Sequence, residues 1–421
     1  MIDIQLIRSQ PELVQQSSER RGSQFSVTEL VELDRKRRAA ILEIDTLRAK
    51  RNEVSREISG GERRSTDLIE EMRNVGSRIK LLEQGERDLA SRLEKILLDI
   101  PNLPSESSPE GLEASSNTIV RRVGELPTFD FEPKPHWEIG QNLGIIDSQR
   151  AVKLSQTRFY VLKGEGAILQ RALINWMLNF HTMEHKYTEL YLPYMVNRAT
   201  VIGSSHLPHF EENMYHDTED DLFMVPTAEA PITGLFRDEI IDASELPMRF
   251  VAHTPCWRRE KFSAGRDTRG IKRVHQFDKV ELYKFVVPET SYAELESLVK
   301  DAEEVCIRLG IPHRVLELCA GDLGFAASKS YDVEMWGAGS QEWLEVSSCS
   351  NCTDFQSRRS AIRYRPTGGG RPKLVHTLNG SGLAIPRVLI AVMEANQQED
   401  GSIVVPEVLR PFTGFERIYR N

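Results

Sequence analysis

The chain has 421 residues, of which 40% are hydrophobic and 28% charged, and its formal net charge is −9. This composition excludes a collagen-like or mainly disordered chain and predicts two or three domains at about 150 residues each. No stretch approaches the ~20 apolar residues that cross a bilayer, the N-terminus carries no export signal, and the five cysteines are too few for a disulfide framework. We therefore expect a cytoplasmic protein that does not contact a membrane.

A long N-terminal segment, residues 28–100, carries apolar residues at alternating steps of three and four. This spacing is typical of helices that pair lengthwise. Residues 59–62 (SGGE) lie between two such halves, and paired glycines end a helix and permit a reversal. We expect an antiparallel helical hairpin that projects as an arm, with its seam interrupted by Arg37, Arg51 and Glu86. The apolar seam positions are Leu30, Leu33, Ala40, Ile44, Leu47, Val54 and Ile58, then Leu68, Met72, Val75, Ile79, Leu82, Leu89, Leu93, Ile96 and Ile100.

The charge of this arm differs from that of the rest of the chain. Residues 28–100 contain 16 Lys and Arg against 16 Asp and Glu, so the arm is neutral while the whole chain carries −9. Most of these cations are arginine, whose planar guanidinium pairs bidentately with phosphate oxygens. From this segment alone two interpretations stay open: a coiled-coil rod that mediates dimerisation, or an arm that grips a phosphate backbone.

A stretch rich in Pro, Ser and Glu, residues 101–111, is typical of a linker. It separates a predicted N-terminal domain, 1–110, from a second domain, 111–421. The second domain mixes helical runs with β-rich runs that lie next to hairpin-like connections, which favours an antiparallel α+β domain over a doubly wound sheet. The predicted helices cover 167–185 and 385–398, the predicted strands cover 159–162, 249–252, 279–285 and 374–378, and 367–371 (TGGGR) is a predicted hairpin tip.

The densest group of cations in the second domain lies in residues 256–275, which hold seven cations against two acids. Gly265 and Gly270 mark a loop between two strands. A solvated hairpin is one interpretation of this segment. A nucleotide site is the other, because the arginines could neutralise a polyphosphate, Glu260 could accept a hydrogen bond from an amino group, and Phe277 offers an aromatic face. No GxxxxGK[ST] loop is present, so ATP chemistry needs another scaffold.

Three ordered motifs resemble those of class II aminoacyl-tRNA synthetases. Arg258-x-Glu260, with its loop and Phe277, is similar to motif 2. Residues 187–196 (YTELYLPYMV), which we expect to run from a helix into a strand at Pro193, are similar to motif 1, the dimer interface of that class. Residues 380–387 (GSGLAIPR) are similar to motif 3.

Three further features narrow the resemblance to seryl-tRNA synthetases of the bacterial type. They are Thr227-Ala228-Glu229, residues 345–348 (EVSS) and the N-terminal arm. The resemblance implies a class II catalytic domain, with an antiparallel sheet flanked by helices, in a homodimer. It further implies that ATP and Mg²⁺ are used to couple L-serine to tRNA(Ser), with tRNA(Sec) as a second tRNA substrate. In that family the arm recognises the long variable stem of the tRNA.

The resemblance also implies site residues. Arg258 and Arg387 would be catalytic, through contacts with the phosphates and the adenine of ATP, and Glu345 and Ser348 would hold Mg²⁺. The implied serine pocket consists of Thr227, Ala228, Glu229, Arg258, Glu281 and Ser381. The implied ATP site consists of Arg258, Arg259, Glu260, Arg273, Val274, Phe277, Glu345, Val346, Ser347, Ser348 and Arg387.

This choice of residues suits the chemistry of amino-acid activation. The serine carboxylate must approach the α-phosphate although both are anionic, so arginines and a divalent cation are needed to offset the repulsion. No side chain need act as a base, because the carboxylate is already ionised. Alanine lacks the hydroxyl of serine and would leave a buried carboxylate such as Glu281 unpaired. Sites that hydrogen-bond a substrate hydroxyl reject the analogue that lacks it by a factor of about 10⁴–10⁵.

Some residues and functions have competing interpretations. Cys349-x-x-Cys352 lacks a second ligand pair for zinc, so we expect it to serve packing. For His136 we expect a structural role and for His275 a role in ordering the loop. Two alternative functions stay open: a class II paralogue that loads a carrier protein, and a non-catalytic coiled-coil scaffold protein.

Overall fold

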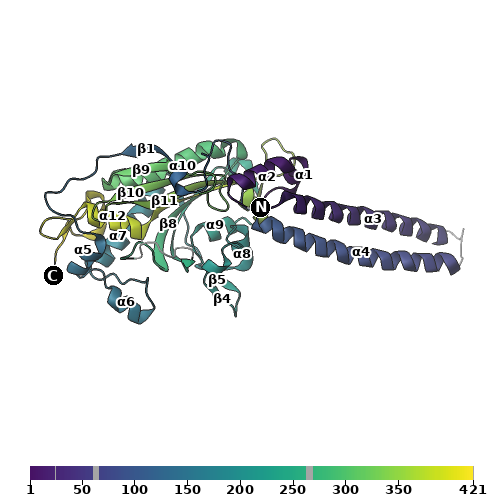
Figure 1. Cartoon of the computed structure of the whole chain (residues 1–421), viewed down its shortest axis with the longest axis horizontal. Helices are drawn as coiled ribbons and strands as arrows, with labels where there is room; N and C mark the ends of the chain where they lie inside the picture. The colour runs from purple at the N-terminus through teal and green to yellow at the C-terminus, as the bar shows by residue number, and fades with distance from the viewer. Residues whose placement is uncertain (24, 60–65, 262–268, 421) are drawn as a thin grey trace. The chain divides into compact units, whose positions relative to one another are not determined.

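The computed structural model describes residues 1–23, 25–59, 66–261 and 269–420. These residues divide into two compact units, Met1–Pro101 and Asn102–Asn421. The predicted reversal at Gly60 and Gly61 and the predicted loop glycine Gly265 lie outside the described residues. Figure 1 shows the first unit as a pair of long helices with two short ones, and the second as a sheet covered by helices.

The regular secondary structure of the first unit, in its described part, consists of helices. Helices α1 (Ile4–Ser9) and α2 (Pro11–Arg20) precede two long antiparallel helices, α3 (Val27–Ser59) and α4 (Thr66–Asp99). At 1.5 Å per residue each long helix extends for about 50 Å. Arg8 makes two hydrogen bonds of 2.7 Å to the carboxylate of Asp34, which is 1% exposed, and this ion pair ties α1 to the base of α3.

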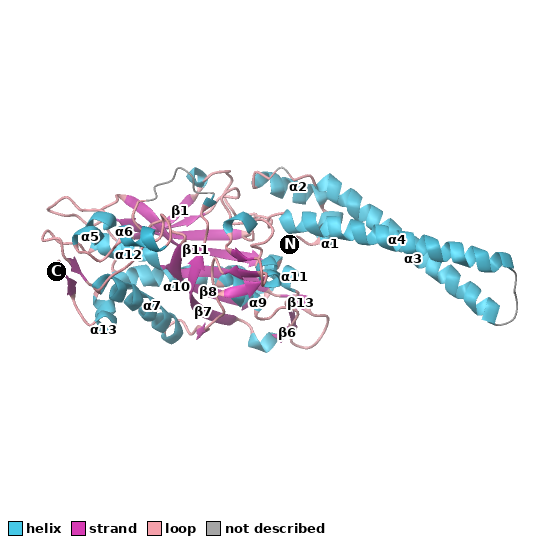
Figure 2. Cartoon of the chain, turned by 90° about the horizontal axis from the view of Figure 1, so that it is seen from below, coloured by secondary structure: helices cyan, strands magenta, loops and turns pink. Residues whose placement is uncertain are grey.

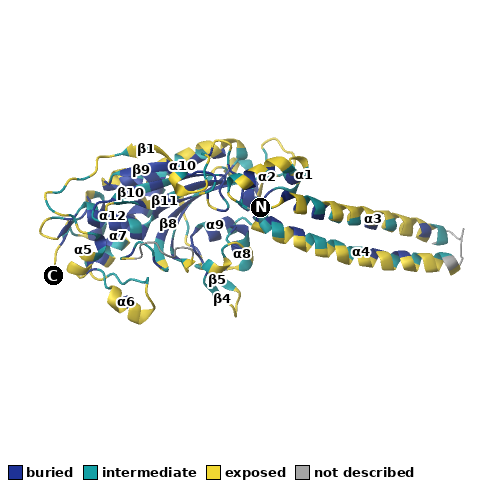
Figure 3. Ribbon diagram, viewed as in Figure 1, coloured by how far each residue is buried: buried dark blue, intermediate teal, exposed yellow. Residues whose placement is uncertain are grey.

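The predicted apolar seam holds the two long helices together. Leu33 and Ile44 on α3 and Val75, Ile79 and Leu93 on α4 are buried. Every predicted seam position is buried or half-buried, whereas most other positions on these helices are exposed (Figure 3). The predicted helical hairpin with a 3.5-residue repeat is thus confirmed.

Charged residues also pair across the hairpin. Arg37 and Glu86, which interrupt the seam, face each other with Nε and Oε1 2.8 Å apart. Ion pairs at the edges of a coiled coil fix the pairing of its helices. Three such pairs join the flanks of α3 and α4: Arg48–Glu83 at 2.9 Å, Lys50–Glu71 at 2.6 Å and Glu43–Arg78 at 2.8 Å.

The predicted linker, residues 101–111, does not behave as a free connection. The Asn102 backbone N–H donates to the Phe325 carbonyl at 2.9 Å, and its side-chain amide donates to the Cys352 carbonyl at 2.9 Å. The Ser105 N–H donates to the Ser328 carbonyl at 2.7 Å. Because its backbone groups are satisfied by neighbouring residues of the second unit, this stretch forms part of that unit from Asn102 onwards.

The second unit is built on an eight-stranded sheet in the order β1-β9-β10-β11-β14-β8-β7-β2. All neighbours pair antiparallel except β2 and β7, which are parallel. The predicted antiparallel α+β domain is therefore confirmed (Figure 2). The strands are β1 (Thr118–Val123), β2 (Thr188–Glu189), β7 (Met248–Trp257), β8 (Gln276–Val286), β9 (His313–Glu317), β10 (Lys329–Gly337), β11 (Glu342–Thr353) and β14 (His376–Ala384).

One face of this sheet is covered by α7 (Glu165–Met183), α10 (Ser291–Leu309) and α12 (Ile385–Ala395). Apolar residues of these helices form one core with Val280 and Leu282 of β8. Since side chains alternate along a strand, Lys279 and Glu281 face the opposite side. Polar groups on that second face are therefore free to build a site.

Several predicted elements differ from the observed ones. Helix α7 ends at Met183, and β2 and β3 (Met195–Asn197) follow it, so the expected passage from a helix into a strand at Pro193 is wrong. The predicted strand 159–162 forms only an isolated bridge between Leu162 and Ile146. The predicted strand 374–378 is broken at Val375, where the chain leaves one sheet and enters another.

Smaller elements surround this core. A second sheet joins β13 (Lys373–Leu374), β12 (Arg363–Arg365) and β6 (Ile240–Asp242), and the glycine-rich run 367–371 connects β12 to β13 as the predicted hairpin tip. Three consecutive glycines there, 368–370, have positive φ, which glycine adopts without steric cost. Within the described ranges, no helix combines the length and the apolar character needed to cross a membrane. The remaining elements are α5 (His136–Asn142), α6 (Ser148–Leu154), α8 (Arg198–Gly203), β4 (His216–Asp217), β5 (Leu222–Met224), α9 (Glu229–Gly234), α11 (Phe355–Ser360), β15 (Ile403–Val404), α13 (Arg410–Thr413) and β16 (Arg417–Ile418).

Candidate active site

The open face of the sheet collects polar side chains from four neighbouring strands. On β8, Phe277, Lys279 and Glu281 follow each other at every second position and share one face. Asn379 and Ser381 do the same on β14. Arg258 directly follows β7, and Arg387 lies in the first turn of α12, which directly follows β14. The strand order β11-β14-β8-β7 therefore brings segments far apart in sequence to one place.

A cavity of about 460 Å³ opens on this face. Residues from motif 2, motif 3 and the 345–348 segment line the same cavity, so the three parts that were predicted separately meet in one site. The predicted site residues that line it are Thr227, Glu229, Arg258, Glu260, Arg273, Val274, Phe277, Glu281, Glu345, Val346, Ser347, Ser348, Ser381 and Arg387.

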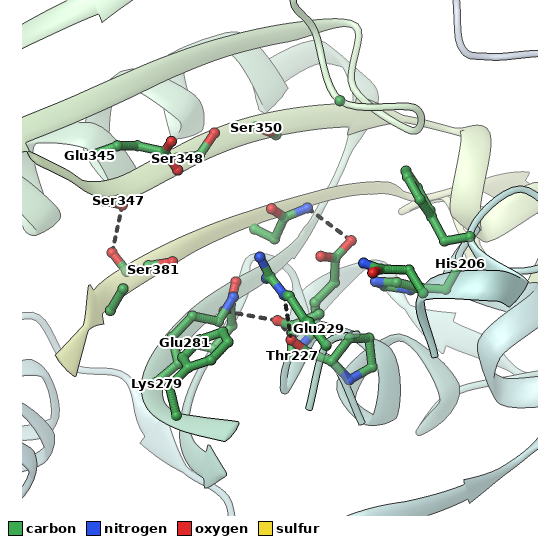
Figure 4. Close-up of a pocket in the computed structure, with 18 of the residues that line it drawn as sticks. His206, Thr227, Glu229, Lys279, Glu281, Glu345, Ser347, Ser348, Ser350 and Ser381 are labelled. Carbon is green, nitrogen blue, oxygen red and sulfur yellow. Dashed lines mark hydrogen bonds and ion pairs between the residues drawn. The ribbon is translucent and has the colours of Figure 1, made fainter. Parts of the chain in front are cut away.

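One end of the cavity is a cluster of buried charged and polar groups (Figure 4). Thr227 donates its hydroxyl to Glu281 Oε2 at 3.0 Å, and Glu281 is only 1% exposed. Lys279 forms an ion pair with the same Glu281 oxygen and is itself buried. A buried carboxylate with these two partners is held in a single orientation, as a specific pocket requires.

Glu229, at the start of α9, lies beside this cluster. Its Oε1 accepts hydrogen bonds from Gln356 at 2.6 Å and from Asn379 at 3.1 Å. Burial, together with repulsion from Glu281, raises the pKa of Glu229 to about 7. The Glu229 side chain therefore changes charge near neutral pH.

Two arginines of the motif 2 segment, Arg258 and Arg273, also line the cavity. The Arg258 Nε donates to the Pro226 carbonyl at 3.3 Å, and the guanidinium lies over the Phe277 ring at 5.2 Å. Arg273 Nη1 donates to Glu260 Oε2 at 3.2 Å. A cation over an aromatic ring and a guanidinium beside a carboxylate hold both arginines in defined positions.

Glu345, Ser348 and Arg387 form the third side of the cavity. Arg387 Nη1 donates to the Glu345 backbone carbonyl at 2.6 Å and lies 3.2 Å from Glu345 Oε1. Glu345 and Ser348 both line the cavity, whereas Ser347 turns toward β14, where its hydroxyl donates to the Ser381 carbonyl at 2.7 Å (Figure 4). The predicted trio Arg258, Glu345 and Arg387 thus shares one cavity.

The donor set of Glu345 and Ser348 suits Mg²⁺. A carboxylate and a hydroxyl are hard oxygen ligands, and Mg²⁺ is commonly held by one or two protein groups together with substrate phosphates. In the part of the chain that the structure describes, no group of three or more His, Cys, Asp or Glu is arranged to hold a metal.

Two predicted site residues are not brought into the cavity, as far as the described residues go. Ala228 is buried in a neighbouring apolar core. Arg259 turns away: its Nε donates to the Met214 carbonyl at 2.9 Å, and its guanidinium lies over the Tyr215 ring at 4.4 Å. Its neighbour Arg258 alone of this pair lines the cavity.

The cavity also contains residues that were not predicted. Lys279 could have been found from the sequence, because it lies two positions before Glu281 on the same face of a strand. Asn379 lies two positions before Ser381 and shows the same signal. Ser350 and Cys352 follow Ser348 at alternate positions on β11 and show it too, whereas His206 lines the cavity without a comparable signal in the sequence.

His275 has the expected ordering position. Its Nδ1 lies 3.1 Å from the Arg258 carbonyl, and its own carbonyl accepts a hydrogen bond from the Arg258 N–H at 2.9 Å. The ring also packs beside Phe159, with the centroids 5.4 Å apart. These contacts hold Arg258 against the strand that returns from the loop.

Comparison with known families accounts for both units. The model of the seryl-tRNA synthetase N-terminal domain matches residues 1–104, and the model of the class II tRNA synthetase core domain (G, H, P, S and T) matches residues 210–396. The hairpin and the catalytic face are thus each recognised as parts of synthetases.

Whole-chain relatives agree with these matches. A serine–tRNA ligase of Roseiflexus sp. (strain RS-1) is 55% identical over 427 residues, which cover 100% of both chains. The crystal structure of seryl-tRNA synthetase from Pyrococcus horikoshii complexed with ATP has a TM-score of 0.95 at 37% identity, again over 100% of both chains. The cytoplasmic serine–tRNA ligase from Naegleria fowleri in complex with AMP has a TM-score of 0.88 at 30% identity, over 100% of this chain and 99% of that one. Its end-to-end similarity to these proteins shows that this chain belongs to the seryl-tRNA synthetase family.

Proposed function

We propose that this chain activates L-serine with ATP and transfers the seryl group to the 3′-terminal ribose of tRNA(Ser). The observation that carries this proposal is the shared cavity of Arg258, Glu345 and Arg387, with the Thr227–Glu281 cluster at one end. The solved relatives that hold ATP or AMP support the nucleotide, and the names of the curated relatives support the amino acid and the tRNA.

In the first step a serine carboxylate oxygen attacks the α-phosphorus of ATP. A new oxygen–phosphorus bond forms, the bond from the α-phosphorus to the bridging oxygen breaks, and pyrophosphate leaves with that electron pair. Arg258 would neutralise the α-phosphate while both reactants are held in line. The second step transfers the acyl group to a ribose hydroxyl of the tRNA, and AMP leaves.

The remaining lining residues have roles in holding the nucleotide. Phe277 offers a ring face to the adenine, Glu260 an acceptor to the adenine amino group, and Arg273 a cation to the outer phosphates. Val274 would contact the nucleotide through its backbone. Arg387 would lie against the adenine or the phosphates from α12.

Glu345 and Ser348 would hold Mg²⁺ at the phosphates. When bound, the ion supplies positive charge that offsets the charge of the polyphosphate. Val346 and Ser347 lie between these two residues, and the hydroxyl of Ser347 is bonded to β14. The roles of Val346 and Ser347 are therefore to set the spacing of Glu345 and Ser348 on β11.

The Thr227–Glu281 cluster would select serine by its hydroxyl. Glu281 has one hydrogen bond from Thr227 and an ion pair with Lys279, and a substrate hydroxyl can donate to it. Alanine has no hydroxyl to donate to this buried acceptor. Sites that hydrogen-bond a substrate hydroxyl reject the analogue that lacks it by a factor of about 10⁴–10⁵. Ser381 completes the pocket from β14.

The pKa of Glu229 predicts how serine use depends on pH. Because Glu229 ionises at about pH 7, its negative charge, which attracts the serine ammonium group, is present above that pH and lost below it. We expect kcat/KM for serine in pyrophosphate exchange to rise between pH 6 and pH 8, since this quantity reports the free enzyme. In Glu229→Gln the value should be lower at pH 8, and the inflection should disappear. An unchanged inflection in this variant would assign it to another group.

The first unit would bind the tRNA. A cavity of 460 Å³ is too small to hold a tRNA. The two long helices of the arm instead present arginines along their length, where a large partner can contact them. We propose that the arm recognises the variable stem of tRNA(Ser), through shape and phosphates, and that tRNA(Sec) is bound in the same way. Binding should weaken steeply as salt rises, because each phosphate contact releases counterions.

We further propose a homodimer that works in the cytoplasm. Met183, Tyr191 and Met195, in and beside the segment similar to motif 1, are 68%, 89% and 40% exposed. Large exposed apolar side chains that gather along one segment are typical of a protein interface. Sedimentation at micromolar concentration tests the dimer.

Serine-dependent exchange of labelled pyrophosphate into ATP tests the proposed function. We expect exchange with L-serine and not with L-alanine, followed by charging of tRNA(Ser). Exchange without charging would instead match a paralogue that loads a carrier protein. Absence of exchange would match a scaffold protein and would refute the proposal.

A further inference from the structure

His136, the first residue of α5, lies between the segment that follows the motif 2 loop and helix α12. It is 1% exposed. Its Nε2 accepts a hydrogen bond from the Ile271 backbone N–H at 3.2 Å, on the segment that returns from the motif 2 loop. Its Nδ1 lies 3.0 Å from Glu394 Oε1 on α12, the helix that carries Arg387. Because Nε2 accepts from an amide, Nδ1 carries the ring proton and donates it to Glu394.

Two glycines make room for this histidine and its neighbour. Gly270 has φ +68°, and a Cβ at this position would lie 1.9 Å from His136 Nε2. On the other side, a Cβ on Gly339 would lie 2.0 Å from the Lys134 carbonyl oxygen. The segment 134–136 therefore fits between two backbones that approach as closely as glycine permits.

Glu394 is a fixed anchor for this arrangement. It is fully buried, and the same Oε1 that contacts the ring also accepts the His136 backbone N–H at 2.9 Å. Its Oε2 accepts the N–H groups of Gly339 and Ser340 at 3.0 and 2.9 Å. Burial alone would raise the pKa of Glu394, but the hydrogen bonds from His136 and Ser340 hold it below its usual value. The carboxylate thus stays ionised and keeps these partners.

We propose that His136 is a positioning residue for ATP, which ties the segment 270–274 to α12. Arg273 and Val274 lie two and three residues beyond the Ile271 contact. Arg387 lies seven residues, or two helical turns, before Glu394 and therefore on the same side of α12. The His136 ring fixes the distance between these two sets of ATP-binding groups. The inference rests on the proposed function, since it assigns ATP to this cavity.

The expected effect is confined to the nucleotide. Among the described contacts, the hydrogen bonds of the His136 ring go to Ile271 and Glu394 only, whereas Thr227, Glu229 and Glu281 are held by each other, Lys279, Gln356 and Asn379. Loss of the His136 contacts should loosen the segment 270–274 and leave the serine cluster in place. A merely structural histidine would affect the affinities for both substrates or for neither.

Two substitutions separate the two ring contacts. An asparagine amide nitrogen takes the position of Nδ1, so His136→Asn keeps the bond to Glu394 and loses the acceptor for Ile271. A glutamine amide reaches the position of Nε2, so His136→Gln keeps an acceptor for Ile271 and loses the side-chain bond to Glu394, while the backbone N–H of residue 136 still donates to Glu394. Gly270→Ala disturbs the same contact from the other side without altering the histidine.

His313→Asn is the matched control. His313 on β9 is also 1% exposed and lies 3.4 Å from a buried carboxylate, Glu303. It does not line the cavity. We expect this variant to lose thermal stability and to bind Mg·ATP with the wild-type Kd.

Equilibrium binding of Mg·ATP, measured by calorimetry, tests the inference, and the KM for serine in pyrophosphate exchange is the second measurement. We expect Kd to rise about tenfold or more in His136→Asn and Gly270→Ala, as for one lost buried hydrogen bond, and less in His136→Gln. The KM for serine should stay within about twofold, and the Ile271 amide should exchange hydrogen faster in His136→Asn. Wild-type Kd in both His136→Asn and Gly270→Ala, or equal rises for ATP and serine, overturns the inference. Failure of the proposed function is distinguishable, because it appears as absent serine-dependent exchange in the wild-type protein.

Discussion

Arg258→Ala should abolish serine-dependent pyrophosphate exchange, with a loss of about 10²–10³-fold or more in kcat. Arg258 lines the cavity with its guanidinium oriented by the Pro226 carbonyl and the Phe277 ring. Removing one preorganised donor from a site where negative charge develops typically costs this much. The measurement is exchange at saturating ATP and serine, where a lower kcat reports the chemical step. Rates near those of the wild type would contradict the phosphate role of Arg258.

The adjacent arginine provides the control for this experiment. Arg259 has the same chemistry and lies one residue away, but its guanidinium lies over Tyr215 rather than in the cavity. Arg259→Ala should therefore retain most of the exchange activity. Equal losses in the two variants would mean that the segment acts through its total charge and not through one positioned group.

Shortening the arm should spare exchange and reduce charging of tRNA(Ser) by at least about 10²-fold. The ion pairs Arg37–Glu86 and Glu43–Arg78 show which levels of α3 and α4 face each other, and they place Ile41 opposite Leu81. Removing residues 42–80 and joining the ends with a short Gly/Ser loop keeps Arg37–Glu86 and Arg8–Asp34 in place. Loss of several phosphate contacts explains a decrease of this size.

Two measurements on the shortened protein decide the role of the arm. Exchange rates within about twofold of the wild type establish that the catalytic unit is intact. The salt dependence of tRNA binding should then become shallower, since fewer counterions are released. Undiminished charging would refute the proposal that the arm binds tRNA.

The arm could be predicted from the sequence because one physical rule governs it. A 3.5-residue apolar repeat has only one common structural solution, and each apolar seam position of the described residues obeys it. The segments around motif 1 were harder to predict, because β2 is only two residues long and its place in the sheet depends on pairing with β7, some 60 residues away. Local propensity carries no information on such a contact.

The site residues divide in the same way, into those that the sequence predicts and those that depend on contacts between distant segments. Arg258, Glu281 and Glu345 were found because ordered motifs resemble a family, and the cavity brings them together. Arg258 and Arg259 were both assigned to the ATP site. The sequence does not show which of two adjacent arginine side chains, at the end of a strand, points into the cavity. Lys279 was missed although strand alternation places it beside Glu281, and its ion pair with that residue appears only in three dimensions.

The Arg37–Glu86 pair defines the register of α3 against α4 at one level of the arm. A slip of one heptad would separate these two half-buried charges and place each beside apolar seam residues, which disfavours the shifted register. Seven residues added to both helices beyond this pair would extend the arm by about 10 Å and leave everything below it untouched. The arm can thus be lengthened or shortened in whole heptads to match the tRNA stem that we propose it binds.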